Sequence, residues 1–552
     1  MKNHITYKIE DVFKSYKSYK ELFVLKDLIF WIEPIKSSKE GINAIFVRPF
    51  NKQKLSPQNL TGEKFYIKNS FHGYGGTSYK CIQKEENIYL IWIDQLSKSL
   101  WSQVFKINNL EINNDYLYPV ESAHKLTKKI EGNFDGCFCL LDQSTLIGLV
   151  EIKERDYLFS LDINSINKDL KILKKFKNFA GDLSANSSSN LLSWIEWDYP
   201  NMPWEKNDLF FAEINFGCEI RKIKRFSNKS INEEKNVSFF QPYWISEKLL
   251  LCSEDSSKWW NLLFIDLSEI DNIVINKRIK KEFFEYGSPQ WVSGIKFFSG
   301  SIKNLFCLAK NQNSWILEQY QDIKLIQEIQ LPFTSVSDLS VFGKKIALKG
   351  QGSNFLGNLI ELDFQENISS NFFQDINFDV IEDFSKPESF WFSGFEGKPT
   401  HSFLYRPLFE SFNKPPLIIR VHSGPTSSFD GSYNHEVQYW TTKGFFVAEV
   451  NYGGSSGFGR AYRERLNSKW GIVDSYDSKA LAIELLNLDL VDSDKIVIFG
   501  NSAGGFTALN ALFEEGIFKA AICKYPVIDL KDMYYNTHRF EKNYLDSLIG
   551  NY

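Results

Sequence analysis

Short apolar runs dominate the first two thirds of the chain. Between about residues 20 and 380, runs such as LKDLIFWIE, NIYLIWID and KLLLCSED alternate with polar turn residues, and almost none has the length or period of a helix. Many short strands without intervening helices indicate an array of β-sandwiches or a β-propeller. About 350 residues divide into seven blades of roughly 40 to 50 residues, so we predict a seven-bladed all-β propeller over residues 1–384. No blade signature recurs, so this prediction depends on strand density and length.

The pattern changes beyond about residue 385. Apolar strands of the doubly buried kind, PPLIIRV, GFFVAEV and KIVIF, now alternate with helical stretches, which predicts a parallel α/β sheet over residues 385–552. The clearest helix is SYDSKALAIELLNLDL, whose apolar positions recur every three or four residues, with Asp474 and Ser475 as expected N-caps. The segment PESFWFSGFEGKPTHSFLYRP predicts an antiparallel strand pair that leads into this sheet.

Composition and charge exclude several classes of protein. The 552 residues carry 64 Lys and Arg against 68 Asp and Glu, a net charge of -4 that offers no basic field for nucleic acid. The amino-terminal sequence lacks the apolar segment of a secretory signal, and no stretch approaches the roughly 18 apolar residues of a membrane-spanning helix. We therefore expect a cytoplasmic protein without a membrane or nucleic-acid partner. The oligomeric state cannot be predicted from these features.

The cysteines and histidines do not predict a metal site. The seven cysteines are scattered, and an odd number in a chain without an export signal favours reduced structural thiols. Cys137 and Cys139 lack the second ligand pair that a zinc site needs. We expect no metal.

The strongest chemical signal is KIVIFGNSAGGFTALNALF. A strand, Lys495 to Phe499, meets Gly500-Asn501-Ser502-Ala503-Gly504, and an Ala-rich helix follows, which is G-x-S-x-G in the strand-turn-helix context of a nucleophile elbow. The turn is so tight that Gly500 and Gly504 must be small, and the following helix N-terminus favours developing negative charge near Ser502. The alternative is a structural glycine-rich turn.

Three other features are weaker. The glycine-rich stretch 451–459, NYGGSSGFG, matches neither phosphate-binding loop pattern, and a simple connection is an alternative. His422 follows a strand at the sheet's carboxyl edge, where a lone histidine is more often structural than a proton carrier. Asp474 and Asp477 resemble a paired acid and base, but helix capping explains them more simply.

These segments together resemble the prolyl oligopeptidase family of serine peptidases, especially its acylaminoacyl-peptidase and dipeptidyl-aminopeptidase-like members. The resemblance is carried by WIEWDYPNMPW (194–204), Phe71 to Tyr79, HSGPT, the stretch 451–459, GNSAGGFTAL and THRFEKNYLDSLIG. It implies a seven-bladed propeller capping an α/β-hydrolase domain, with a cavity between them that admits short peptides and excludes folded proteins. It further implies Ser502 as nucleophile, with the Tyr452 hydroxyl and the Ala503 N–H as oxyanion donors, and no cofactor.

One departure from the family pattern affects the predicted activity. The family places its catalytic Asp and His on loops later than the 50 residues that follow Ser502, so we expect both beyond Tyr552 and the C-terminal part of the hydrolase domain to be missing. His538 matches no catalytic motif, and the sixth strand should then expose an apolar edge. A second departure is Gly73, where many relatives carry Glu.

Two functions from different classes remain open at this stage. The first is a serine-type peptidase that hydrolyses short peptides through an acyl-enzyme on Ser502. The alternative is a catalytically inactive propeller and hydrolase remnant that acts as a binding protein. An esterase or lipase is a third possibility, which the propeller cap disfavours.

Overall fold

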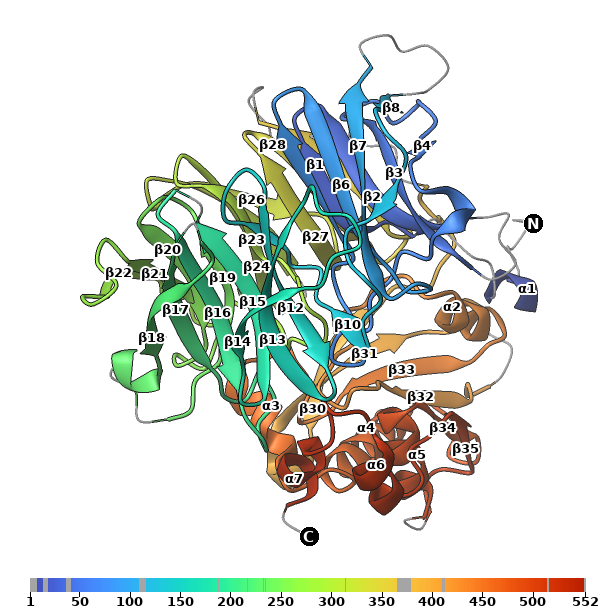
Figure 1. Cartoon of the computed structure of the whole chain (residues 1–552). Coiled ribbons are helices and arrows are strands. Elements are labelled where there is room, and N and C mark those ends of the chain that lie inside the picture. The colour runs from blue at the N-terminus through green and yellow to red at the C-terminus, as the bar shows by residue number, and fades with distance from the viewer. Residues whose placement is uncertain are drawn as a thin grey trace.

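The chain forms two parts that lie one against the other (Figure 1). The computed structural model describes residues 7–12, 18–35, 41–108, 116–186, 188–215, 217–231, 233, 235–312, 314–364, 379–409, 413–513 and 516–550. Seven successive sheets form the first part, and one mixed sheet with helices forms the second. Both predictions of fold class, the seven-bladed propeller and the α/β-hydrolase arrangement, are confirmed.

Each blade is an antiparallel sheet of strands that follow one another in the sequence. The first blade consists of β1 (Lys20–Leu25), β2 (Leu28–Pro34), β3 (Asn43–Pro49) and β4 (Gln58–Asn59), and the second of β5 (Tyr79–Lys84), β6 (Asn87–Asp94), β7 (Ser99–Ile107), β8 (Leu117–Pro119) and β9 (His124–Lys125). The third blade consists of β10 (Gly132–Phe134), β11 (Cys139–Leu140), β12 (Thr145–Ile152), β13 (Arg155–Asp162) and β14 (Lys171–Lys175), the fourth of β15 (Phe179–Asn186), β16 (Leu191–Trp197), β17 (Asp208–Ile214) and β18 (Ile220–Phe226), and the fifth of β19 (Phe239–Trp244), β20 (Leu249–Glu254), β21 (Asn261–Asp266) and β22 (Val274–Arg278). The sixth blade consists of β23 (Phe298–Ser301), β24 (Asn304–Asn311), β25 (Ser314–Gln321) and β26 (Lys324–Leu331), and the seventh of β27 (Ser335–Phe342), β28 (Lys345–Gln351) and β29 (Asn358–Asp363). Two short 3-10 turns, η1 (Gly62–Lys64) and η2 (Asn228–Ile231), lie in the loops of the propeller.

Burial decreases from the middle of a blade to its outer edge. The second strand of the fifth blade, β20, has every residue buried, because neighbouring blades cover both of its faces. The outer strand β18, IRKIKRF, instead alternates half-buried and exposed positions. The continuous apolar runs in the sequence are therefore middle strands, and the alternating polar runs are edge strands.

Four blades share a bulge in the innermost strand. In β1, β15, β19 and β27 the register shifts at one point, and the residue at that point has positive φ. These residues are polar but differ in type: Glu21, Asp182, Gln241 and Asp338. A bulge turns the polar side chain out of the ladder toward the neighbouring blade.

The bulge side chains accept hydrogen bonds from the backbone of the next blade. Asp182 accepts from the Gln241 N–H at 3.1 Å, and the Gln241 side chain accepts from the Phe297 N–H at 2.7 Å. Asp338 accepts from the Glu21 N–H at 3.0 Å, and Glu21 accepts from the N–H of Ser78. This ring of bonds satisfies backbone donors at the inner ends of the blades.

The first and seventh blades meet through side chains. No described strand of one blade joins the sheet of the other. Arg48 forms a buried ion pair with Glu361, and the Val24 N–H donates to Ser340 Oγ at 2.9 Å. An apolar cluster covers this junction, formed by Leu22, Val24, Ile29, Trp31, Phe50, Ala347 and Leu359.

The second part is built on a six-stranded sheet in the order β30-β31-β33-β32-β34-β35. Its elements are β30 (Glu388–Ser393), η4 (Phe395–Gly397), β31 (Pro399–Tyr405), β32 (Leu417–Val421), α2 (His435–Thr442), β33 (Phe446–Asn451), α3 (Arg460–Arg463), η5 (Glu464–Leu466), α4 (Val473–Asn487), β34 (Ile496–Asn501), α5 (Ala503–Phe513), β35 (Ala520–Lys524), α6 (Leu530–Asn536) and α7 (Tyr544–Ile549). As predicted, β30 and β31 form an antiparallel pair, and β33, β32, β34 and β35 are parallel.

Helices cover both faces of this sheet, with α2 on one side and α4 and α5 on the other (Figure 1). Ile418 and Val447 pack with Val437 of α2, whereas Ile419 and Ala448 belong to the core that includes α4 and α5. Both faces of the parallel strands are therefore buried, which explains their unbroken apolar sequence. Among the described residues, no helix combines the length and apolarity needed to cross a membrane.

The contacts of Ser385 agree with the predicted division after residue 384. The Ser385 N–H donates to Gln438 Oε1 at 2.7 Å, and its hydroxyl donates to the Arg406 carbonyl at 2.6 Å, both in the second part. At the other end of the chain, α1 (Ile9–Val12) packs on α2, and Tyr433 donates to the Tyr7 hydroxyl at 2.8 Å. The amino-terminal residues of the predicted propeller domain thus contact the hydrolase part, and the division itself stays a prediction.

The ring of bulges predicts a pH-dependent stability. Burial raises the pKa of Asp182 to about 7, so the folded protein holds this proton more tightly than the unfolded chain does. The contribution of Asp182 to the free energy of unfolding is therefore fully present below about pH 4 and is lost as the pH rises through about 7. Asp182→Asn keeps an acceptor for the Gln241 N–H but does not titrate. We expect its melting temperature, relative to wild type, to rise between about pH 5 and about pH 8, measured by calorimetry.

An exposed acid provides the control for this prediction. Asp322 pairs with Lys303 at the protein surface, and Asp322→Asn, the same substitution at an exposed site, is measured over the same pH range. A difference in melting temperature between Asp182→Asn and wild type that stays constant across the same pH range would contradict this prediction.

Candidate functional site

Ser502 occupies a strained turn between a strand and a helix. β34 ends at Asn501, α5 begins at Ala503, and Ser502 between them has a φ of 50°. Such a conformation costs a serine about 1–3 kcal/mol, so the surrounding structure must impose it. The Ser502 N–H donates to the Lys524 carbonyl of β35, and its own carbonyl accepts from the N–H groups of Gly505 and Phe506 in α5. Backbone bonds on both sides thus hold the turn, as the nucleophile-elbow interpretation requires.

Steric crowding explains why both elbow positions, Gly500 and Gly504, are glycine. A Cβ on Gly500 would lie 2.0 Å from the Gly504 carbonyl oxygen. A Cβ on Gly504 would lie 2.6 Å from the carbonyl oxygen of Val421 and 2.7 Å from that of His422. Helix α5 therefore approaches the end of β32 so closely that only glycine fits at residue 504.

Parallel pairing brings three predicted residues to one edge of the sheet. Val421 of β32 lies in register with Val450 of β33 and with Gly500 of β34. His422, Tyr452 and Ser502 follow these three strands at their carboxyl ends. This is the edge at which α/β proteins bind ligands.

His422 is part of a buried structural network. Its Nδ1 lies 2.9 Å from the Ser423 carbonyl oxygen, and its Nε2 lies 2.7 Å from Ser455 Oγ. Burial lowers the pKa of His422 to about 4, so the ring is neutral, donates from Nδ1 and accepts at Nε2. The ring stacks on Tyr452 with 4.2 Å between centroids. These contacts agree with the structural role that the sequence favours for this histidine.

Tyr452 is fully buried beside this histidine. Its hydroxyl lies 3.0 Å from the Pro425 carbonyl oxygen and 3.3 Å from the His422 carbonyl oxygen. Burial raises the pKa of Tyr452 well above its ordinary value, so the hydroxyl remains a donor. In this conformation it donates to a backbone carbonyl of the 422–425 loop, and a role as oxyanion donor requires this bond to be exchanged.

Asp474 and Asp477 are anchors rather than helix caps, and this corrects the prediction from the sequence. α4 begins at Val473, one residue before the predicted cap, and none of its cap bonds comes from a side chain. Asp474 accepts from the Gly471 N–H and from the Thr507 hydroxyl on α5. Asp477 accepts from the N–H groups of Gly453 and Phe395, each at 2.7 Å. Burial raises the pKa of both carboxyls to about 6. The two acids thus hold α5 and the loop that follows β33.

A buried ion cluster joins the propeller to the second part near this edge. Arg539 donates to Asp156 Oδ1 at 2.6 Å and to Glu151 Oε1 at 3.1 Å, and its guanidinium lies over the Phe179 ring. His72 contacts the other Asp156 oxygen at 2.7 Å. The segments FHGYGG and THRFEK, which carry the family resemblance, therefore meet at Asp156. The sequence marked both segments, but it gave no sign that they touch.

An aromatic cluster surrounds this ion cluster. The Phe540 ring lies within aromatic contact distance of His72, Tyr74, Phe179, Trp197, Trp204, Trp291 and His538. His538 fills the space beside Gly73, where a Cβ would lie 2.9 Å from the ring. Burial lowers the pKa of His538, and its Nε2 lies 3.5 Å from Glu541. No described contact joins His538 to Ser502, in agreement with its exclusion as a catalytic base.

The described residues supply neither a partner for the Ser502 hydroxyl nor a metal site. No hydrogen bond to Ser502 Oγ is present in the described part of the chain, and no group of three or more metal-ligating side chains occurs there. All seven cysteines are free thiols. Among the described strands, β35 pairs with β34 alone and leaves Ile522 43% exposed at the sheet edge, as the sequence predicts for the sixth strand.

Comparison with known proteins confirms the family resemblance. Residues 431–552 match the family model of the prolyl oligopeptidase family. Dipeptidyl-peptidase 5 of Schizosaccharomyces pombe is 28% identical over 158 residues, 27% of this chain and 23% of that protein. Acylamino-acid-releasing enzyme 1 of Oryza sativa is 30% identical over 119 residues, 21% of this chain and 15% of that protein. The matches thus span less than a quarter of the length of these curated relatives.

Solved structures share the fold over nearly the whole chain. A puromycin-hydrolyzing peptidase of Mycobacterium tuberculosis superposes with a TM-score of 0.84 at 22% identity, over 98% of this chain and 82% of that one. The acylaminoacyl peptidase of Pyrococcus horikoshii gives a TM-score of 0.66 at 14% identity over the same shares. The fold is therefore that of a propeller joined to an α/β-hydrolase, and the family match lies in the part that carries Ser502.

The close approach of α5 to β32 makes a testable prediction. In a helix, Gly→Ala normally stabilises by about 1 kcal/mol, but Gly504→Ala should instead destabilise by about 1–3 kcal/mol, because its Cβ meets two carbonyl oxygens. Thermal unfolding of the variant measures this loss. Gly343→Ala is the control, because nothing lies within 4 Å of its Cβ and only its positive φ opposes the change. A Gly504→Ala protein that melts at or above the wild-type temperature would refute the steric argument.

Proposed function

We propose that this protein is a serine-type peptidase of short peptides. The observation that carries the proposal is Ser502, held with positive φ between β34 and α5 by backbone bonds on both sides. Together with the prolyl oligopeptidase family match over residues 431–552, this geometry favours acyl transfer through a serine nucleophile.

In the proposed reaction, Ser502 Oγ attacks the scissile carbonyl and forms an acyl-enzyme, which water then hydrolyses. The Ala503 N–H is one oxyanion donor, because it lies in the first turn of α5, where N–H groups have no acceptor within the helix. The Tyr452 hydroxyl is the second donor once it leaves the Pro425 carbonyl. Gly500 and Gly504 permit the turn. No metal or organic cofactor takes part.

The acid and base of the triad come, in this proposal, from polypeptide outside residues 1–552. A serine hydroxyl needs an adjacent base to become a nucleophile, and no described residue contacts Ser502 Oγ. The open edge of β35, with its exposed Ile522, is where such polypeptide would add to the sheet.

The substrates are short peptides because the propeller covers the edge of the sheet that carries Ser502. Arg539 and Asp156 join the two parts, and Trp291 of the propeller donates to the Thr426 carbonyl at 2.8 Å. A puromycin hydrolase with this fold has been solved in complex with PGG. The contacts between the propeller and the second part favour a site that folded proteins cannot enter.

The alternative, a catalytically inactive binding protein, shares the same fold. It is favoured by the absence, among the described residues, of a base at Ser502. The two proposals differ in turnover, which the next experiment measures.

Hydrolysis of short peptide arylamides by the protein isolated from its natural source tests the peptidase proposal. Ser502→Ala, introduced at its native locus, should lower kcat by roughly 10⁶-fold, because the nucleophile is lost. Turnover that survives Ser502→Ala, or a wild-type protein that turns over no arylamide, would refute the proposal, and the second result would favour the binding protein.

Tyr452→Phe separates the two roles of this hydroxyl. Loss of an oxyanion donor should lower kcat by about 10²–10³-fold with little change in KM. If the hydroxyl is purely structural, its loss should instead lower the melting temperature and leave kcat near wild type, because only its bonds to the carbonyls of the 422–425 loop would be lost. Kinetics and calorimetry on the same preparation distinguish these results.

A further inference from the structure

A cavity of about 400 Å3 lies between the propeller and the loops at the carboxyl edge of the sheet. Lys296, Lys310 and Trp315 line it from the propeller. Ser456 and Gly457 line it from the stretch 451–459, the same loop that begins with Asn451 and Tyr452. The cavity therefore adjoins the loop to which the proposed function assigns an oxyanion donor.

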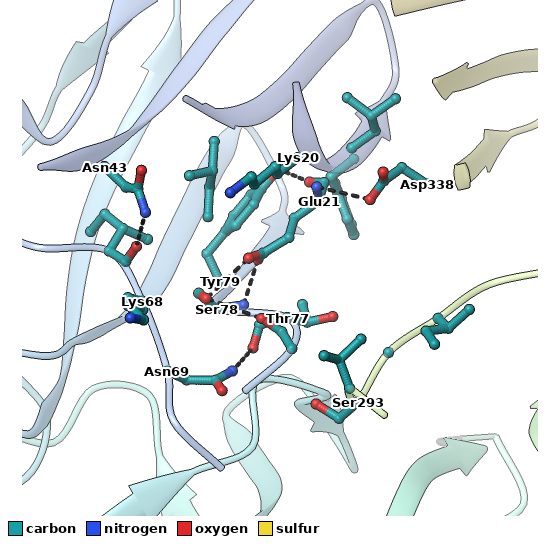
Figure 2. Close-up of a pocket in the computed structure, with 18 of the residues that line it drawn as sticks. Lys20, Glu21, Asn43, Lys68, Asn69, Thr77, Ser78, Tyr79, Ser293 and Asp338 are labelled. Carbon is teal, nitrogen blue, oxygen red and sulfur yellow. Dashed lines mark hydrogen bonds between the residues drawn. The ribbon is translucent and has the colours of Figure 1, made fainter. Parts of the chain in front are cut away.

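A second cavity of about 550 Å3 lies beside the first two blades and shares the wall at Val292, Ile295, Lys296 and Asp338. Figure 2 shows Glu21 and Asp338 in this second cavity, with Glu21 bonded to Ser78. The Asp338 carboxylate accepts from the Glu21 N–H. Asp338, the acid of the shared wall, thus belongs to the ring of bonds between blades.

Lys296 and Lys310 are half-buried ammonium groups without an ion-pair partner among the described residues. Burial lowers the pKa of both lysines, and this effect outweighs the attraction of the carboxylates around them. A Cβ on Gly457 would lie 3.1 Å from Lys310 Nζ, so this ammonium extends across the cavity to the hydrolase loop.

The acids that face Lys310 already accept other hydrogen bonds. Glu285 accepts from the N–H groups of Trp260 and Gly459, and burial raises its pKa to about 7. Asp430 accepts from the Ser432 N–H. Both carboxylates attract the lysine, but neither reaches the 4 Å of an ion pair in the described structure. Lys310 therefore keeps its donors for a ligand.

Apart from the two lysines, the acids Glu285 and Asp338 and several serines, the walls of the cavity are apolar. Phe297, Leu308, Trp315 and Val336 line it from the propeller blades. An apolar wall with a few polar groups is typical of a ligand site, and ammonium groups without an ion-pair partner in such surroundings favour a carboxylate.

We propose that this cavity is a carboxylate-binding subsite, in which Lys310 and Lys296 hold the carboxylate of a short peptide and the apolar wall holds its neighbouring side chain. This inference depends on the proposed function only for the statement that the bound peptide is a substrate. The carboxylate has two possible sources, a free carboxyl terminus or an acidic side chain.

Calorimetric titration of the Ser502→Ala protein tests the subsite without turnover. The probes are acetyl-Ala-Phe with a free carboxylate, the same peptide as its amide, and acetyl-Phe-Glu amide with a side-chain carboxylate. We expect at least one carboxylate peptide to bind roughly 10-fold or more tightly than the neutral amide, because a charge-assisted bond to an ammonium is lost in the amide. The better of the two carboxylates identifies the source.

Variants assign the effect to the cavity. Lys310→Met should reduce the binding of the carboxylate peptide to the level of the amide, Lys296→Met should reduce it in part, and Lys310→Arg should restore it. Lys303→Met, at an exposed lysine of the same blade, is the control and should change nothing. Melting temperatures measured in parallel show whether each variant is folded.

Equal binding of acid and amide, no binding of either, or a Lys310→Met protein that still prefers the carboxylate would overturn the subsite. The result of this binding experiment does not depend on the result of the arylamide hydrolysis experiment. Preference for a carboxylate in a protein that hydrolyses no arylamide would refute the proposed function and leave the subsite standing.

Discussion

The parallel register of β33, β32 and β34 is the constraint on which the candidate site depends. Val421 is paired with Val450 on one side and with Gly500 on the other, so all three strands end at one edge. The residues that follow them, His422, Tyr452 and Ser502, must therefore share that edge. Gly504 then allows α5 to approach β32 closely, and Asp474 and Asp477 fix the helix and the loop beside the turn.

The propeller supplies the other half of the site, and it is held together by polar side chains. Bulges in four innermost strands send Glu21, Asp182, Gln241 or Asp338 to the backbone of the next blade. Glu21 and Asp338, the acids of this ring nearest Lys296, accept backbone hydrogen bonds and form no ion pair with it in the described structure. The polar interior of the propeller and the proposed carboxylate subsite thus adjoin at Lys296.

The sequence predicted those features that depend on local spacing. The change to a parallel sheet and the Ser502 turn leave periodic or motif signals within about 20 residues, whereas the seven sheets were predicted from strand density and length. The bulge ring left none, because Glu, Asp and Gln serve the same role and no single residue type recurs. Asp474 was predicted as a cap because sequence spacing cannot show that Thr507 lies beside it. Asp156 and Arg539 are 383 positions apart, and only the fold brings them together.

The central claim is that Ser502 is the reactive nucleophile of this protein. Labelling with a fluorophosphonate, followed by mass mapping of the modified peptide, tests it most directly, using the protein isolated from its natural source. The account predicts one label for each molecule, on Ser502, and prior incubation with a short peptide should slow the labelling. A protein that remains unlabelled, or that carries the label on another residue, would contradict it.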